Sequence, residues 1–290
     1  TQANNQEWGS FTTTSTLPSG AAGIETFVGT TRMGKYSLGG GQSLRESYPG
    51  LNDGPVKLLA TNSVPLLPAE RVIYTVKGVQ TSFSEMMGLP DSQLDTTYWL
   101  PWYNNVDLDT QLRIGNVSNS NATIQVFIGG QEMNGSPFTL APGASTRKSF
   151  PGINSGPVEI VSNVKVIAAE RVIYKVKGVQ TSFSEMMALP DSQLDTTYLL
   201  PWYNNVDLDT QLRFANVSPS TATVHVRIGG VEVNGSPFTL TPGASTRKSF
   251  PGVNNGPVEI ESNVKVIAAE RVIYKVKGVQ TSFSEMMALP

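Results

Sequence analysis

The sequence predicts an all-β protein made of three tandem immunoglobulin-like β-sandwich domains joined by short apolar linkers. Three observations predict this fold. Apolar side chains alternate with polar ones at a period of about two residues, which is the period of a strand. Turn signals rich in Gly, Pro and Asn recur at intervals of roughly 8 to 12 residues. The whole pattern repeats after 100 residues, which leaves room in each copy for about seven short strands, as in an immunoglobulin-like sandwich.

Domain boundaries follow from the repeat. Residues 91–190 and 191–290 align without a gap and differ at 14 positions. Residues 1–90 form a third, diverged copy that lacks a counterpart of 91–100 and therefore lacks the first strand segment. We expect one domain in each copy, and we number the copies repeats 1 to 3 in chain order. Near-identical neighbours are typical of rods, stalks and adhesins, in which each added copy gives length or avidity.

The first half of repeat 2 predicts three strands. An aromatic strand is expected over 96–103, where Pro101 indicates an edge position or a crossing point. A second strand is expected over 110–117. The third, over 122–128, alternates between apolar and polar side chains, as a half-buried strand does.

The second half of repeat 2 begins with two turns, Gly129-Gly130 and the strong tight-turn signal Asn134-Gly135. Pro-Gly and Asn-Gly punctuation continues through the rest of the copy and keeps the strands short. The remaining strands are expected over 136–140, 145–150, 157–161 and 164–176.

An apolar segment, 178–190 in repeat 2, joins one copy to the next. Ser182 and Glu185 have the spacing of a capping box, which predicts one helical turn through Met187. The segment is too apolar for a flexible linker, so its large side chains are expected either to pack at the junction and stiffen a rod or to cap their own domain. These side chains are Phe183, Met186, Met187 and Leu189, and in repeat 3 Phe283, Met286, Met287 and Leu289.

A set of motifs accompanies this pattern: TTYWLPWYNN, a Pro-Gly turn with GPV, AERVIY and SFSEMMGLP. The set resembles a tandem repeat module of secreted bacterial proteins, found in Chloroflexota and some Gram-positive bacteria. In that module similar TEYWFPWYDN, GPV, SERSLY and SFNEVMGYP segments recur beside wall-associated domains. The resemblance covers 91–290 and roughly the last 45 residues of repeat 1. It implies a β-sandwich and an extracellular, cell-surface location, and it implies no functional residue because the module has no assigned chemistry.

Composition excludes several classes of function. The chain has no cysteine and one histidine, His225, which excludes thiol nucleophiles, Cys/His zinc sites and Ser-His-Asp triads. With 21 basic against 23 acidic residues, no nucleic-acid partner is expected. No apolar run approaches the roughly 18 residues of a membrane span. We therefore expect no enzyme, and the chemistry left open is that of carboxylates or of oxygen-bound calcium.

Two pairs of aspartates are candidate calcium ligands. Asp107 and Asp109, with Asp207 and Asp209 in repeat 3, lie two residues apart and so on one face of a strand. Neighbouring Asn and backbone oxygens could complete a calcium site. The glycine and distal glutamate of an EF-hand are missing, and the alternative is that these side chains cap the backbone at a strand–turn boundary. No other cofactor is expected.

Aromatic residues near the start of each repeat are candidate glycan contacts. They are Trp99, Trp102 and Tyr103 in repeat 2, and Trp202 and Tyr203 in repeat 3. The alternative is that these rings fill the sandwich core and cover the junction, as such residues usually do. The exchange of Trp99 for Leu199 fits packing better than sugar stacking.

Other polar residues have structural interpretations. Glu170 and Arg171 are adjacent on a strand and point to opposite faces, and we expect cross-strand ion pairs with partners such as Arg113 or Asp109. The residue types for a Lys–Asn isopeptide cross-link are present at Asn163, Lys165, Glu170 and Lys175. Asn-x-Ser/Thr triplets begin at Asn116, Asn121 and Asn134, and the first and third recur in repeat 3 at Asn216 and Asn234.

The missing strand segment of repeat 1 bears on assembly. An incomplete sandwich leaves a sheet edge open, and an open edge invites another chain. We expect a head-to-tail homopolymer in which an end of one subunit docks on the first domain of the next. The alternative is that repeat 1 is a capping domain with its own N-terminal strand. The net charge of −2 opposes self-association little.

The sequence thus predicts an extracellular structural protein, a subunit or segment of a cell-surface fibre, filament or stalk. The alternative is a multivalent adhesin or carbohydrate-binding repeat array on the bacterial surface, whose partner is a cell-wall or matrix glycan. Aromatic rings exposed in a line would favour the array, and rings buried in cores and junctions would favour the structural protein.

Overall fold

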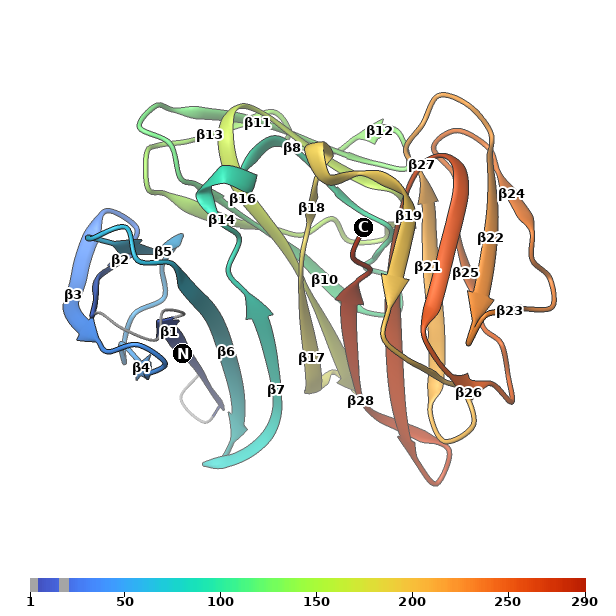
Figure 1. The fold of residues 1–290 in the computed structure, drawn as a ribbon, viewed down its shortest axis with the longest axis horizontal. Helices are drawn as coiled ribbons and strands as arrows, with labels where there is room; N and C mark the ends of the chain where they lie inside the picture. The colour runs from blue at the N-terminus through green and yellow to red at the C-terminus, as the bar shows by residue number, and fades with distance from the viewer. Residues whose placement is uncertain (1–4, 16–20) are drawn as a thin grey trace.

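The computed structural model describes residues 5–15 and 21–290, and these residues form strands joined by turns (Figure 1). Within the described residues the helical elements are two short 3-10 turns, η1 (Asp91–Gln93) and η2 (Asp191–Gln193), and there is no α-helix. The prediction of an all-β, sandwich-like fold is confirmed. No helix in this part of the chain is long and apolar enough to cross a bilayer.

Repeat 1 contains seven described strands, β1 (Asn5–Ser15), β2 (Ala22–Val28), β3 (Thr31–Leu38), β4 (Ser43–Glu46), β5 (Val56–Ala60), β6 (Leu66–Val76) and β7 (Val79–Met87). They form a four-stranded sheet of order β4-β1-β6-β7 and a three-stranded sheet of order β3-β2-β5. Among the described strands β5 pairs with β2 alone, so one edge of β5 is open.

Repeat 2 contains β8 (Asp95–Leu100), β9 (Tyr103–Asn104), β10 (Asp109–Asn116), β11 (Ala122–Ile128), β12 (Gln131–Glu132), β13 (Phe138–Leu140), β14 (Ser145–Lys148), β15 (Asn154–Ser155), β16 (Val158–Val176), β17 (Val179–Met187) and β18 (Leu189–Pro190). The main path of its sheet is β12-β11-β16-β10-β14, with β8, β13 and β17 attached to it. Strand β8 pairs with the first part of β16. The counterpart of this part of β16 in repeat 1 is β5, whose open edge is the one that β8 covers in repeat 2.

Repeat 3 follows the same plan. It contains β19 (Asp195–Leu200), β20 (Tyr203–Asn204), β21 (Asp209–Asn216), β22 (Ala222–Ile228), β23 (Val231–Glu232), β24 (Phe238–Leu240), β25 (Ser245–Lys248), β26 (Asn254–Asn255), β27 (Val258–Val276) and β28 (Val279–Met287). Its sheet has the order β23-β22-β27-β21-β25, and β19, β24 and β28 pair with members of that path.

The long strands β16 and β27 connect two structural regions of each repeat. The first part of β16 pairs with β8 and β11 over a core that includes Ile160 and Tyr98, while its second part pairs with β10 and β17. The buried Tyr98 hydroxyl donates to the carbonyl of Val166 at 2.7 Å, which satisfies the one polar atom of that ring.

The apolar segment that was expected to link the repeats is a strand of the sheet. Strand β17 pairs antiparallel with β16 across a two-residue turn, Lys177-Gly178, in which both residues have positive φ (50° and 80°). A turn of this kind matches the twist of two antiparallel strands. The prediction of a helical turn over Ser182–Met187 is wrong, because polar and apolar residues alternate here at the strand period and pairing with β16 satisfies the backbone.

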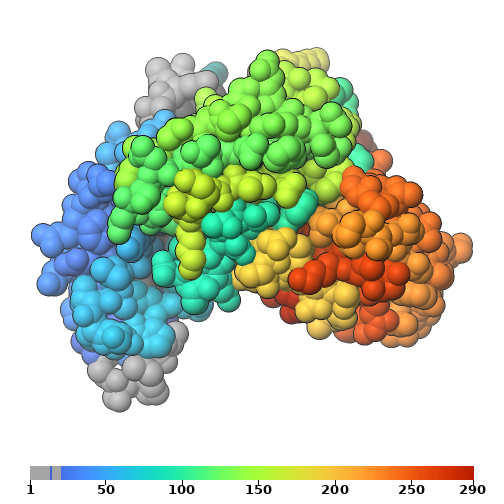
Figure 2. Space-filling model, turned by 90° about the horizontal axis from the view of Figure 1, so that it is seen from above, coloured from blue at the N-terminus to red at the C-terminus, as the bar shows by residue number. Residues whose placement is uncertain are grey.

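The hairpins β6–β7, β16–β17 and β27–β28 stack against one another in chain order. Strand β17 lies between β7 and β28 and contacts both (Figure 1). Seen from above, repeat 2 lies between repeats 1 and 3 (Figure 2). Contacts between hairpins therefore form part of each junction between repeats.

Candidate functional site

Each hairpin has two faces because side chains alternate along a strand. The face of repeat 2 that contacts repeat 1 consists of Arg171, Ile173, Phe183 and Glu185, and we call it the front face. The face that contacts repeat 3 consists of Glu170, Val172, Tyr174 and Ser184, and we call it the back face. The positions 100 residues earlier and later define the same two faces in repeats 1 and 3.

An aromatic side chain fills each junction. Phe183 is fully buried and packs against Val72 and Tyr74 on the back face of repeat 1. The rings of Tyr74 and Phe183 meet edge to face, with centroids 6.4 Å apart and an interplanar angle of 88°. Phe283 packs in the same way against Val172 at the second junction. Burying such a ring contributes about 1.5–3 kcal/mol.

A hydrogen bond from the backbone of one repeat to a serine of the preceding one crosses each junction. The N–H of Glu185 donates to Ser84 Oγ at 2.9 Å, and the N–H of Glu285 donates to Ser184 Oγ at 2.8 Å. Among the described strands β17 pairs only with β16, so the serine supplies the acceptor that the outer edge of β17 needs.

Each junction also holds two carboxylates and two guanidinium groups, which we call the junction charge cluster. The first cluster consists of Glu70, Arg113, Arg171 and Glu185, and the second of Glu170, Arg213, Arg271 and Glu285. Arg171 Nε donates to Glu185 Oε1 at 2.6 Å, with both side chains nearly buried. Arg271 Nη2 lies 2.5 Å from Glu285 Oε1. Loss of one partner from such a pair leaves a buried charge without compensation.

Burial and like charge raise the pKa of the glutamates that face these pairs. Burial, followed by the charge of Glu185, raises the pKa of Glu70 to about 7, against the opposing effect of Arg171 and Arg113. Burial and the charge of Glu285 raise the pKa of Glu170 well above its usual range. Two carboxylates in one buried cluster favour the protonated form of one of them, so Glu70 at the first junction takes up a proton as the pH falls through about 7.

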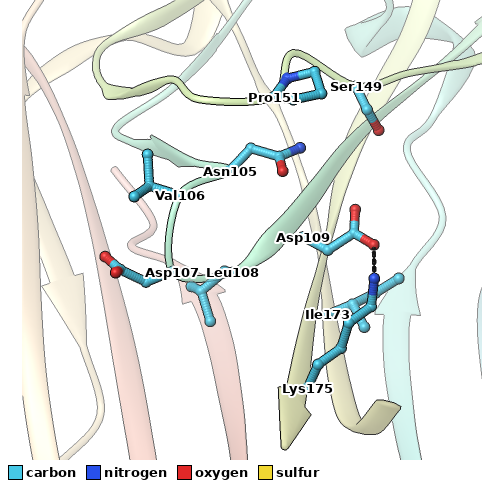
Figure 3. Close-up of a pocket in the computed structure, with 9 residues that line it drawn as sticks. All are labelled: Asn105, Val106, Asp107, Leu108, Asp109, Ser149, Pro151, Ile173 and Lys175. Atoms are coloured by element: carbon cyan, nitrogen blue, oxygen red, sulfur yellow. Dashed lines mark hydrogen bonds and ion pairs between the residues drawn. The ribbon is translucent and has the colours of Figure 1, made fainter. Parts of the chain in front are cut away.

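Of the candidate calcium residues, Asp107 and Asp109 line a pocket together with Lys175 (Figure 3). Asp109 Oδ2 accepts a hydrogen bond from Lys175 Nζ at 2.5 Å, while Asp107 points in another direction and accepts one from Asn104 Nδ2 at 3.3 Å. The described residues contain no group of three or more His, Cys, Asp or Glu side chains that could share a metal ion. The ammonium group of Lys175 therefore already balances the charge of Asp109. In repeat 3 the ammonium group of Lys275 does the same for Asp209, at 2.7 Å.

The candidate glycan residues divide into buried and exposed rings. Tyr103 and Tyr203 are at most 1% exposed, and their hydroxyls donate to the carbonyls of Thr110 and Thr210. These two rings are core residues and lie out of reach of a sugar. Trp202 is 54% exposed.

The tryptophans of repeat 2 lie at the junction with repeat 3. Trp99 packs against the core of repeat 3 and donates from Nε1 to Asp191 Oδ1 at 2.8 Å. Trp102 lies under the guanidinium of Arg213, 5.6 Å from the ring centroid. Both rings of repeat 2 therefore contact the next repeat.

The structure separates the apolar residues that were expected at a junction. Phe183 and Phe283 lie on front faces, as described above. Met186 and Leu189 are buried in the cores of repeats 2 and 3 respectively. Met187 is half-buried, and so is Met287, which contacts both of these cores. Met286 and Leu289 are 39% and 69% exposed.

Cross-strand ion pairs are present, as expected, but Arg171 has a partner other than the one named. Arg171 pairs with Glu185, and Asp109 pairs with Lys175. Glu170 and Arg171 do point to opposite faces, because Glu170 faces repeat 3 and Arg171 faces repeat 1. The adjacent Glu–Arg pair of each repeat could have predicted this arrangement. In a tandem array the Glu on one face of a strand meets the Arg on the opposite face of the next repeat, as Glu170 meets Arg271.

The candidate residues for an isopeptide cross-link and for glycosylation have other roles in the structure. Among the isopeptide candidates, Asn163 accepts a hydrogen bond from the N–H of Thr123 at 2.7 Å and Lys175 is bonded to Asp109. Asn116 is fully buried and donates to the carbonyl of Leu140, so it is inaccessible to glycosylation.

No protein-family model matches the chain, and no curated protein is similar to it in sequence.

Proposed function

We propose that this chain is a structural protein of the cell surface, acting as a subunit or segment of an extracellular fibre, filament or stalk assembled head-to-tail. The observation that carries the proposal is the repetition of one junction. Phe183 and Phe283 fill equivalent positions, and Ser84 and Ser184 accept equivalent hydrogen bonds. A contact that is used twice in succession extends an array one unit at a time.

The junctions favour stiffness over flexibility. Leu189, at the end of repeat 2, is 5% exposed and belongs to the core of repeat 3. At the other junction the backbone N–H of Glu185 adds a directional contact between repeats, because it donates to Ser84 Oγ at 2.9 Å. A rod built from such contacts needs no cofactor and no catalytic residue. The absence of cysteine suits a bacterial surface protein that does not rely on disulfides.

Negative-stain electron microscopy of the purified chain across a concentration series tests the proposal. We expect filaments whose axial repeat matches the length of three sequence repeats. Isolated short rods at every concentration would remove self-assembly and leave a segment of a longer fibre or an adhesin.

A carbohydrate-binding array is the second candidate, and Trp202 favours it. This exposed indole donates from Nε1 to Asn254 Oδ1 at 2.9 Å, which fixes the orientation of a ring that solvent can reach. A glycan array probed with the chain and with Trp202→Ala tests this candidate. Binding that the substitution abolishes would favour the array over the structural role.

A further inference from the structure

The two outermost hairpin faces of the chain are uncovered copies of faces that are buried inside it. On the front face of repeat 1, Phe83 is 51% exposed, whereas its equivalent Phe183 is fully buried. On the back face of repeat 3, Tyr274 is 50% exposed, whereas its equivalent Tyr74 is 4% exposed. The chain therefore presents an unused aromatic ring at one end and an unused site for such a ring at the other.

The hydrogen-bonding groups show the same asymmetry. Ser84 and Ser184 are buried and accept the cross-junction bonds from Glu185 and Glu285, but Ser284 is exposed. At the opposite end, the described residues offer the N–H of Glu85 no corresponding serine. A donor and an acceptor of matching type thus lie on the two outer faces.

A buried carboxylate marks the back face of repeat 3. Glu270 is 3% exposed, and its Oε1 has no hydrogen-bond partner among the described residues. It lies on the same side of β27 as Tyr274, because the two are four residues apart on one strand. The equivalent Glu170 faces Arg271 of the following repeat. Among the described residues, no arginine faces Glu270 as Arg271 faces Glu170.

We propose that the back face of repeat 3 binds the front face of repeat 1 of a second copy of this chain, in the register of the internal junctions. Phe83 of one molecule packs against Val272 and Tyr274 of the other. The guanidinium of Arg71 lies near the carboxyl group of Glu270, and Ser284 Oγ accepts a hydrogen bond from the backbone N–H of Glu85. This inference rests on the proposed head-to-tail assembly and specifies its contact.

The choice of a second copy follows from identity of sequence. The outer front face carries Arg71, Ile73, Phe83 and Glu85, the same residue types as the front faces of repeats 2 and 3. The outer back face carries Glu270, Val272, Tyr274 and Ser284, the same types as the back faces of repeats 1 and 2. The two surfaces differ from each other, so the contact is heterologous and propagates without closing within a dimer.

One departure makes the contact between molecules weaker than the internal ones. Arg113 and Arg213 pair in the sheet with Ala169 and Ala269, whereas the residue that pairs with Ala69 is Thr12. Repeat 1 thus brings one guanidinium fewer to its front face than repeats 2 and 3 bring to theirs. Assembly should therefore depend on concentration and be reversible by dilution.

The test uses two full-length variants, each with one disabled end. Phe83→Glu places a charge on the front face of repeat 1, and Tyr274→Glu places one on the back face of repeat 3. Both side chains are half exposed, so the fold should tolerate the change, which circular dichroism checks. Ser284→Arg, at an exposed position of the same back face, replaces Tyr274→Glu if that variant does not fold. Val231→Glu, at a 68% exposed position elsewhere in repeat 3, is the matched control.

Size-exclusion chromatography with light scattering gives the readout. Wild type and Val231→Glu should assemble into species that grow with concentration, and each disabled variant alone should remain at the 31.2 kDa of one chain. An equimolar mixture of the two variants should stop at a dimer of twice that mass, because one functional back face meets one functional front face.

Disabled variants that assemble like wild type would overturn this contact and leave head-to-tail assembly standing on another surface. Wild type that remains monomeric at every concentration would overturn the contact and also remove the subunit form of the proposed function. In that case the outer faces would belong to another partner or to further repeats of a longer chain.

Discussion

Ser84 accepts a hydrogen bond from the backbone N–H of Glu185 at 2.9 Å, across the boundary between two repeats. The relationship recurs between Ser184 and Glu285 at 2.8 Å. Residues 101 positions apart are thereby fixed to each other by a side chain that is unremarkable in its own hairpin. Repeat 2 therefore takes part in both bonds: its Ser184 accepts a hydrogen bond from repeat 3, and its Glu185 N–H donates one to repeat 1.

Replacing Ser184 by Ala should destabilise the second junction by about 1–3 kcal/mol, because the N–H of Glu285 would then be buried without an acceptor. The measurement is hydrogen exchange of the Glu285 amide in dilute solution, where protection should fall. Ser284→Ala is the matched control, since this serine is exposed, and it should leave the exchange unchanged. Equal exchange in both variants would show that the serine does not hold the junction.

Replacing Phe183 by Ala should lower the free energy of unfolding by about 3–5 kcal/mol, the usual cost of emptying a buried aromatic site. Urea titration in dilute solution measures the change. Phe83→Ala removes the same atoms from the equivalent, half-exposed position of repeat 1, and its cost should stay near 0.5 kcal/mol. Similar costs at the two positions would contradict the placement of Phe183 between repeats.

The all-β class was predictable because strand alternation and turn residues are local features. The hairpin β16–β17 was missed in part because Ser182 and Glu185 imitate a capping box. The junction partners could not be predicted from one repeat, since Tyr74 and Phe183 meet only when the repeats stack. For Tyr103 the sequence left a glycan contact and a core position open, because an aromatic strand has the same sequence whether its rings face the core or the solvent, and the structure places the ring in the core.

The stability of the chain should fall as the pH rises from about 4.5 to 7. Burial raises the pKa of Glu270 from its ordinary value of 4.5 to about 7, so the folded chain retains a proton that the unfolded chain has already released. The stabilising contribution is complete below 4.5 and is lost as the pH rises through 7, with a slope of up to about 1.4 kcal/mol per pH unit.

Glu270→Gln should make this part of the stability profile less steep, because the amide resembles the protonated carboxyl and does not titrate, while Glu70 still does. Urea titrations at several pH values, in dilute solution, measure the slope. Asp91→Asn, at an exposed position, is the control and should retain the wild-type profile. A Glu270→Gln profile as steep as that of wild type would mean that the buried carboxyl does not titrate in this range.

Replacing Arg171 by Met should destabilise the first junction by about 3–5 kcal/mol, because Glu185 would keep a buried charge without its partner. Arg71→Met removes the equivalent pair with Glu85 on the outer front face, where the side chains are 42% and 51% exposed. There, the loss should be at most about 1 kcal/mol, since water replaces the lost partner. Urea titration of both variants in dilute solution gives the comparison.

The double variant Arg171→Met with Glu185→Met should recover most of the lost stability, because two apolar side chains then fill the space of the ion pair. If the double variant is no more stable than Arg171→Met alone, the cost comes from lost packing of the arginine stem over the Phe183 ring, which lies 4.9 Å from the guanidinium, rather than from the uncompensated charge.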